Sequence, residues 1–130
     1  MPQQTTTKKC ITNIRRAKMA EASHTTGTLS KVKWIALGDG GVNGQGTVID
    51  PLPANTALAH ELIRKEYTSS QKISNTCYAY TIKLNEDELV GDFISEMALI
   101  DAAGDVVAFS NFLAKGKDET EVTFTIEDNF

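Results

Sequence analysis

The order of hydrophobic and polar positions divides the chain into one helical segment followed by strands. Between Ile11 and Ala22, apolar residues recur at spacings of three and four, which predicts an amphipathic helix. The apolar run at residues 31–37 predicts a strand, and it ends abruptly in the glycine-rich residues 38–41. We expect a sharp turn there, because glycine adopts positive φ angles without steric cost.

Alternation of apolar and polar residues predicts a strand over residues 75–84, with Tyr78, Tyr80 and Ile82 on one face. The turn-forming residues 101–105 indicate a hairpin between two apolar runs. Three strands are predicted in this part of the chain, at residues 93–100, 106–113 and 121–126. The expected fold is α+β and mostly antiparallel, a meander or a sandwich, with one N-terminal helix. A helix or a second sheet must cover one face.

Two stretches have less regular patterns. Residues 38–55 are rich in glycine and proline and predict a long loop, and loops of this length are usually functional or mobile. In residues 56–67, the spacing of Leu58 and Leu62 favours a helix. Alternation over residues 62–67 fits a strand equally well, but the pattern taken alone predicts a helix.

Length and charge narrow the class of protein. The chain has 130 residues, which favours a single domain, here residues 11–130 after a flexible N-terminus at residues 1–10. Its net charge of −4 argues against a nucleic-acid partner, because nucleic-acid-binding surfaces are basic. Residues 1–20 lack the apolar core of a signal peptide, and no run approaches a membrane span. We therefore expect synthesis in the cytoplasm and no membrane insertion.

Residues capable of chemistry are few and poorly spaced. The two cysteines, Cys10 and Cys77, are far apart, so neither a disulfide scaffold nor a metal-ligand spacing is indicated. We expect Cys77 to be a small buried residue. His60-Glu61 begins a zinc-protease motif, but Arg64 occupies the position of the second histidine. No catalytic, metal-binding or cofactor-binding residues are therefore predicted.

The glycine-rich segment does not match a nucleotide-binding loop. A phosphate-binding loop requires a lysine that is absent here, and the third glycine of G-x-G-x-x-G is replaced by Asn43. Two classes of function stay open at this point. The first is a small carbohydrate-binding module, with which Trp34 and the tyrosines are compatible. The second is an enzyme of unknown type, against which the lack of a catalytic pair argues.

Five segments carry a resemblance. They are ITN at 11–13, WIALGDG at 34–40, TALAHELIR at 56–64, FISEMALID at 93–101 and AGDVVAFSN at 103–111. In this order they resemble the LTN, GDG, T-x-L-x-x-E-x-x-R, F-x-I-x-E-x-G-L-F-D and D-G-x-L-x-A-x-x-N motifs of phage tail-collar fibre proteins. The segment at 93–101 is one residue tighter at its start than the family motif, and Ala98 stands where the family usually has glycine.

The resemblance implies a structural tail protein without catalysis. Domains of this family join the N-terminal end of a tail fibre to the baseplate of a contractile tail. The implied partners are a baseplate or other tail protein and, since fibres are commonly trimers, a homotrimer; the implied location is the virion tail. The resemblance also favours a strand at residues 61–67. Because fibres of the family continue into a shaft, we expect either an excised domain or a short stand-alone version.

An attachment domain needs an exposed element that docks onto its partner. The loop at residues 38–55 is the candidate, because of its length and glycine content. The candidate docking residues are Gly38, Asp39, Gly40, Gly41, Asn43, Gly44 and Gly46.

Overall fold

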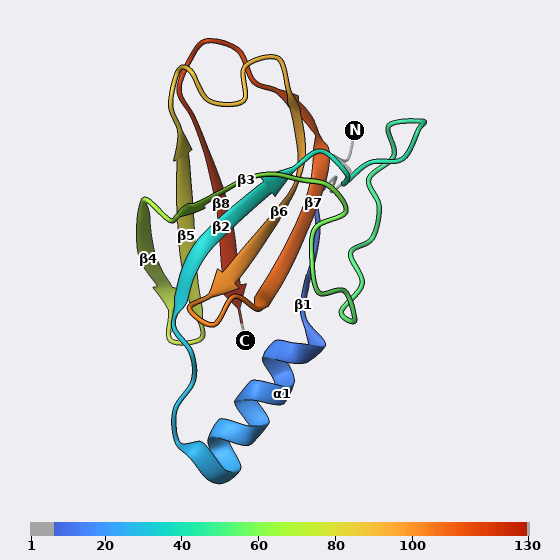
Figure 1. Ribbon diagram of the computed structural model, residues 1–130. Coiled ribbons are helices and arrows are strands. Elements are labelled where there is room, and N and C mark those ends of the chain that lie inside the picture. The colour runs from blue at the N-terminus through green and yellow to red at the C-terminus, as the bar shows by residue number, and fades with distance from the viewer. Residues whose placement is uncertain (1–6, 130) are drawn as a thin grey trace.

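The computed structural model describes residues 7–129, which form two antiparallel sheets packed face to face (Figure 1). The larger sheet has five strands in the order β1-β7-β6-β2-β3, and the smaller has three in the order β4-β5-β8. In the larger sheet the strands are β1 (Lys8–Ile11), β2 (Val32–Gly38), β3 (Glu61–Glu66), β6 (Phe93–Asp101) and β7 (Val106–Gly116). In the smaller sheet they are β4 (Ser69–Ser74), β5 (Cys77–Leu84) and β8 (Val122–Asn129). The mostly antiparallel α+β fold is confirmed.

The main core lies between the two sheets. Ile35 and Leu99 from the larger sheet pack in one cluster with Ile82 and Phe124 from the smaller sheet. Burial of each such aliphatic side chain contributes roughly 1.5–3 kcal/mol to the stability of the fold. A second cluster on the outer face of the larger sheet includes Leu58, which comes from the long loop. The loop therefore belongs to the packed structure.

Within the described residues the one α-helix, α1 (Asn13–Glu21), lies below the sheets and is followed by a π-helical turn over Ala22–Thr26 (Figure 1). Thr12 caps the helix, because its Oγ1 accepts a hydrogen bond from the Arg15 N–H at 3.1 Å and donates one to the Val106 carbonyl at 2.6 Å. The guanidinium of Arg15 lies 3.2 Å from a carboxylate oxygen of Asp128, and both side chains are buried. This ion pair fixes the helix to β8.

The predicted N-terminal helix is present over Asn13–Glu21 with Thr12 as its N-cap, and it is preceded by Lys8–Ile11, which pairs with β7 as strand β1. Residues 8–10 of the predicted flexible N-terminus therefore belong to the sheet, while residues 1–6 lie outside the described residues. The assignment of residues 11–130 to one domain stays a prediction.

The helix that the pattern favoured within residues 56–67 is wrong. Residues 61–66 form strand β3, as the resemblance implied, because they pair with β2 along the sheet edge. The meander alternative is also wrong, since β5 pairs with β8 rather than β6 and so builds the second sheet. Strand β4 was not predicted, because its residues are all exposed and only backbone pairing with β5 defines it.

The buried pair between Arg15 and Asp128 gives the first testable prediction. Burial raises the pKa of the Asp128 carboxyl, although the neighbouring Arg15 charge opposes this shift. We expect Arg15→Met to lower the free energy of unfolding by about 3–5 kcal/mol, because it leaves a buried carboxylate without its guanidinium partner. Urea denaturation measures the loss.

The double variant Arg15→Met/Asp128→Leu is the matched control. It should recover most of the lost free energy, because no buried charge remains to be desolvated. A double variant as unstable as the sum of the two single changes would show that the ion pair is not the source of the effect.

Candidate docking loop

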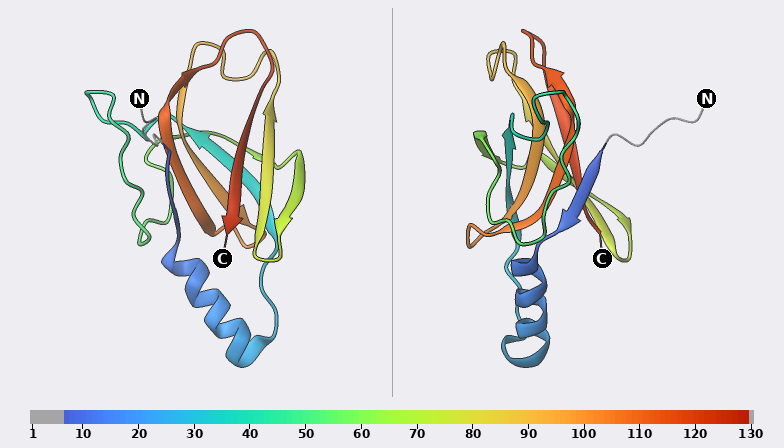
Figure 2. Two further views of the ribbon diagram at one scale, coloured as in Figure 1. Left: turned by 180° about the vertical axis from the view of Figure 1, so that it is seen from behind. Right: turned by 90° about the vertical axis from the view of Figure 1, so that its right-hand side faces the viewer.

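The predicted docking element lies in the loop of residues 39–60, which connects β2 to β3 and stands out at one side of the larger sheet (Figures 1 and 2). β2 and β3 are hydrogen-bonded neighbours, with Gly38 opposite Glu61. The two ends of the loop therefore start from adjacent positions at the sheet edge, and the chain between them projects from a rigid base.

The base of the loop is held by the carboxylate of Glu96, on β6. This side chain is 2% exposed and accepts three backbone hydrogen bonds. Its Oε2 accepts the N–H groups of Gly40 at 2.7 Å and His60 at 2.8 Å, and its Oε1 accepts the N–H of Ala59 at 2.9 Å. Gly40 precedes the loop's projecting part and Ala59 and His60 end it. One buried charge thus holds both ends together, through hydrogen bonds of the stronger, charge-assisted kind.

The glycines at the start of the loop are needed for close approach to β6. A Cβ on Gly38 would lie 2.3 Å from the His60 carbonyl oxygen, and one on Gly41 would lie 2.0 Å from that of Ser95. The N–H of Gly41 donates to the Ser95 Oγ at 2.9 Å. The predicted reason for these glycines is wrong, because positive φ occurs at Gly46 but not at residues 38–41.

The tip of the loop, residues 43–47, is a small exposed turn closed by pairing of Val42 with Val48. The Oδ1 of Asn43 accepts the N–H groups of Gln45 at 2.9 Å and Thr47 at 3.0 Å. The Asn43 N–H also donates to the Thr47 carbonyl at 2.9 Å. The tip is therefore an ordered structure that presents its side chains to solvent.

The returning arm of the loop is attached to the outer face of the larger sheet. The Ile49 carbonyl accepts a hydrogen bond from Asn111 Nδ2 at 2.9 Å, and the Pro53 carbonyl accepts the Asn13 N–H at 2.8 Å. Leu58 is 9% exposed within the outer cluster. In contrast, Ile49 and Leu52 are 43% and 57% exposed, so this part of the arm leaves apolar side chains at the surface.

A histidine–aspartate pair closes the base on its solvent side. His60 Nδ1 lies 2.5 Å from Asp39 Oδ1, and Asp39 N–H donates to the His60 carbonyl at 3.2 Å. The hydrogen bond to Asp39, and then its negative charge, raises the pKa of His60. The pair is a second connection between the two ends of the loop, and its charge state depends on pH because His60 titrates.

The predicted docking residues fall into two groups. Gly38, Asp39, Gly40 and Gly41 form the base, and Asn43, Gly44 and Gly46 form the exposed tip. Sequence reasoning missed Glu96 and Ser95 as the groups that hold the base. The available signal was an acidic residue in the middle of the apolar run 93–100, since a buried charge must be paired or hydrogen-bonded.

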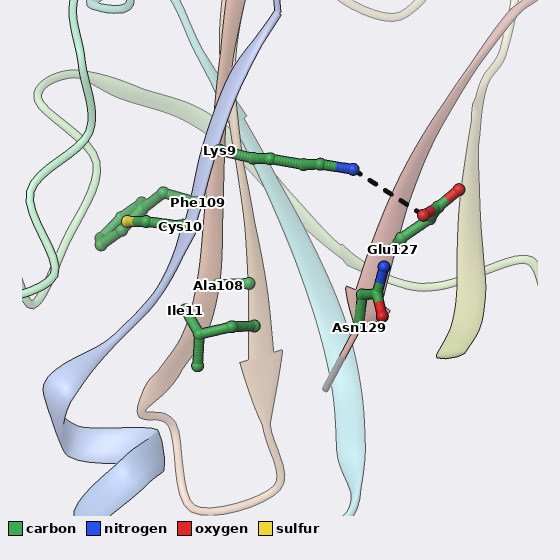
Figure 3. A pocket seen from close by; sticks show the side chains of 7 residues that line it. All are labelled: Lys9, Cys10, Ile11, Ala108, Phe109, Glu127 and Asn129. Atoms are coloured by element: carbon green, nitrogen blue, oxygen red, sulfur yellow. Dashed lines mark ion pairs between the residues drawn. The ribbon is translucent and has the colours of Figure 1, made fainter. Parts of the chain in front are cut away.

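A hollow of about 220 Å³ lies between β1 and β8, where the two sheet edges approach each other (Figure 3). Its clearest polar feature is Lys9 Nζ, 3.7 Å from Glu127 Oε2, while Cys10 and Phe109 lie together on the other side of β1. Burial raises the pKa of the Cys10 thiol, which disfavours the reactive thiolate. The hollow is smaller than usual ligand pockets.

Within residues 7–129, no group of three or more histidine, cysteine or acidic side chains is placed to hold a metal ion. The same part of the chain has no helix that is long and apolar enough to span a membrane. The prediction that Cys77 is buried is confirmed, with 4% exposure.

Comparison with known proteins identifies the family. The sequence model of the phage tail-collar fibre protein N-terminal family matches residues 3–125. The chain therefore belongs to this family of structural phage tail proteins, whose members associate with other tail proteins. No curated protein and no solved structure shows a significant match to the chain.

The role of Glu96 is tested by Glu96→Gln. The amide offers one acceptor oxygen and an NH₂ group that faces backbone donors, so we expect a loss of roughly 3 kcal/mol in the free energy of unfolding. Amide hydrogen exchange should accelerate at Gly40, Ala59 and His60. Glu86→Gln, in an exposed turn, is the matched control and should leave both measurements unchanged.

We expect the contact between His60 and Asp39, which joins the two ends of the loop, to depend on pH. Because the folded-state pKa of His60 is raised, the charged pair is complete below the ordinary histidine pKa and is lost as pH rises through the raised value. NMR titration of the His60 ring should give a midpoint above that of an unfolded chain, and Asp39→Asn should lower it. Equal midpoints in the two proteins would exclude the pair.

Proposed function

We propose that this chain is an attachment domain that joins a tail fibre to the baseplate of a contractile tail, and that the tip and returning arm of the loop are its docking surface. The observation that carries the proposal is the combination of a firmly held base with an exposed tip. Glu96 holds both ends of the loop, while residues 43–47 are exposed. A docking element of this kind loses little conformational freedom on binding.

The chemistry of the exposed surface fits a protein partner. Ile49 and Leu52 offer apolar area next to the backbone and amide groups of the tip. Interfaces commonly combine an apolar centre with a polar rim. The proposed partner is a baseplate or other tail protein, and the proposed location is the virion tail. A homotrimer is the proposed assembly of the fibre end, in which each copy contributes one loop.

The carbohydrate-binding alternative has less support, because most of the relevant aromatic rings pack within the fold. Tyr67 and Tyr80 pack edge to face with their ring centroids 5.0 Å apart, and Tyr80 borders the core. Trp34 packs against the outer cluster. Tyr78 is 43% exposed, and a sugar-stacking surface usually needs a larger exposed aromatic face.

Replacement of the tip tests the proposal. Residues 43–47 are exchanged for Gly-Gly. Two residues are enough to connect the paired Val42 and Val48 as a short hairpin turn. The thermal unfolding midpoint should stay close to that of the parent protein, while incorporation into tail particles should be lost. Incorporation is measured by immunoblotting purified particles.

A matched control places Gly-Gly at residues 75–76, the turn between β4 and β5. This change removes similar side chains from another exposed turn and should leave incorporation intact. Normal incorporation of the tip variant would contradict docking by the loop. Loss of incorporation in both variants would show that the effect is not specific to it.

A further inference from the structure

The tip of the loop contains a sequence with its own chemistry. Asn43 is followed by Gly44, and this is the one asparagine–glycine pair in the 130-residue sequence. Both residues are exposed, and a Cβ built on Gly44 would meet no heavy atom within 4 Å. We propose that Asn43 is a site of spontaneous deamidation, which converts it to a mixture of aspartate and isoaspartate.

The reaction needs water but no enzyme, oxidant or metal. The backbone nitrogen of Gly44, after loss of its proton to solvent, attacks Cγ of Asn43. A bond forms between these two atoms, the bond from Cγ to Nδ2 breaks, and Nδ2 leaves as ammonia with a proton from solvent. Water then opens the five-membered succinimide at either carbonyl. One opening gives aspartate, and the other gives isoaspartate, in which the main chain passes through the former side chain.

The hydrogen bonds of the tip favour the first step. Attack on Cγ places negative charge on Asn43 Oδ1, and this oxygen already accepts N–H groups from Gln45 at 2.9 Å and Thr47 at 3.0 Å. Donors that are in place where an oxyanion develops lower the barrier to acyl transfer.

Other exposed asparagines provide internal controls. Asn55 and Asn75 are each followed by threonine, and Asn85 is followed by glutamate. A side chain on the following residue crowds its backbone nitrogen and restricts the rotation that ring closure needs, whereas glycine imposes neither restriction. We therefore expect Asn43 to react first.

Deamidation changes the surface that the proposed function assigns to docking, and this consequence rests on that function. Aspartate adds a negative charge but keeps the acceptor oxygen of residue 43. Isoaspartate also inserts a methylene group into the main chain between two bonds of the turn, Asn43 N–H to Thr47 O and Gly46 N–H to Asn43 O. These two bonds cannot both keep their geometry, so the tip is reshaped and docking decreases as the protein ages.

The test follows the mass of each asparagine peptide in the full chain. Purified protein is incubated for weeks at mildly alkaline pH, digested, and analysed by liquid chromatography and mass spectrometry, which separates the aspartate and isoaspartate forms. Conversion should occur at Asn43 and remain minor at Asn55, Asn75 and Asn85. Gly44→Ala should slow conversion by about tenfold or more.

Gly44→Ala is a suitable variant because the added methyl group lies in open space and the φ angle of Gly44 is not positive. Conversion of Asn43 no faster than that of Asn75, or conversion unaffected by Gly44→Ala, would overturn the proposal. These readouts are independent of docking. Deamidated protein that still enters tail particles normally would count against the docking role of the tip and leave the chemical site established.

Discussion

The structure of the loop depends on the hydrogen bonds that the Glu96 carboxylate accepts from the backbone. This carboxylate is buried in the larger sheet and accepts three backbone N–H groups from the two ends of a loop that spans residues 39–60. A buried carboxylate without such donors would lower the stability of the fold, and so would buried backbone N–H groups without an acceptor. The two requirements satisfy each other, and this fixes where the loop leaves the sheet and where it returns.

Several other features follow from this constraint. The chain can approach Glu96 only because Gly38 and Gly40 have no Cβ, which would lie within 3 Å of the carboxylate. The sheet behind Glu96 is rigid because β6 is paired on both sides, with β2 and β7. The second core cluster then holds the returning arm through Leu58. The result is a projecting element with a stiff base.

The sequence allowed much of the fold to be predicted. Strands with clear alternation or long apolar runs, such as residues 77–84 and 93–101, lie where the pattern placed them. Strand β4 escaped prediction because all of its side chains are exposed, and β3 because its pattern fits both a helix and a strand. Whether such segments form strands depends on the strands they pair with. When those partners are distant in the chain, the local sequence pattern does not reveal them. The same limit left the choice between a meander and a sandwich open, since the pairing of β5 with β8 joins residues far apart in the chain.

The candidate site was predicted in part. The glycines of the loop marked its position, but the reason they are needed was visible only with β6 in place. Glu96 carried a recognisable signal as an acidic residue in an apolar run, although the sequence does not show which N–H groups it accepts. The hydrogen bonds of Asn13 and Asn111 to the returning arm had no signal, because they depend on the packing of three separate elements.

The central claim, that this chain is a tail component at the fibre junction, is tested most directly by its location in assembled particles. Tail particles from the source of the chain are labelled with a gold-conjugated antibody against it and imaged by electron microscopy. We expect the label to cluster at the baseplate end of the tail. Particles without label, in preparations where the chain itself is expressed, would contradict the claim.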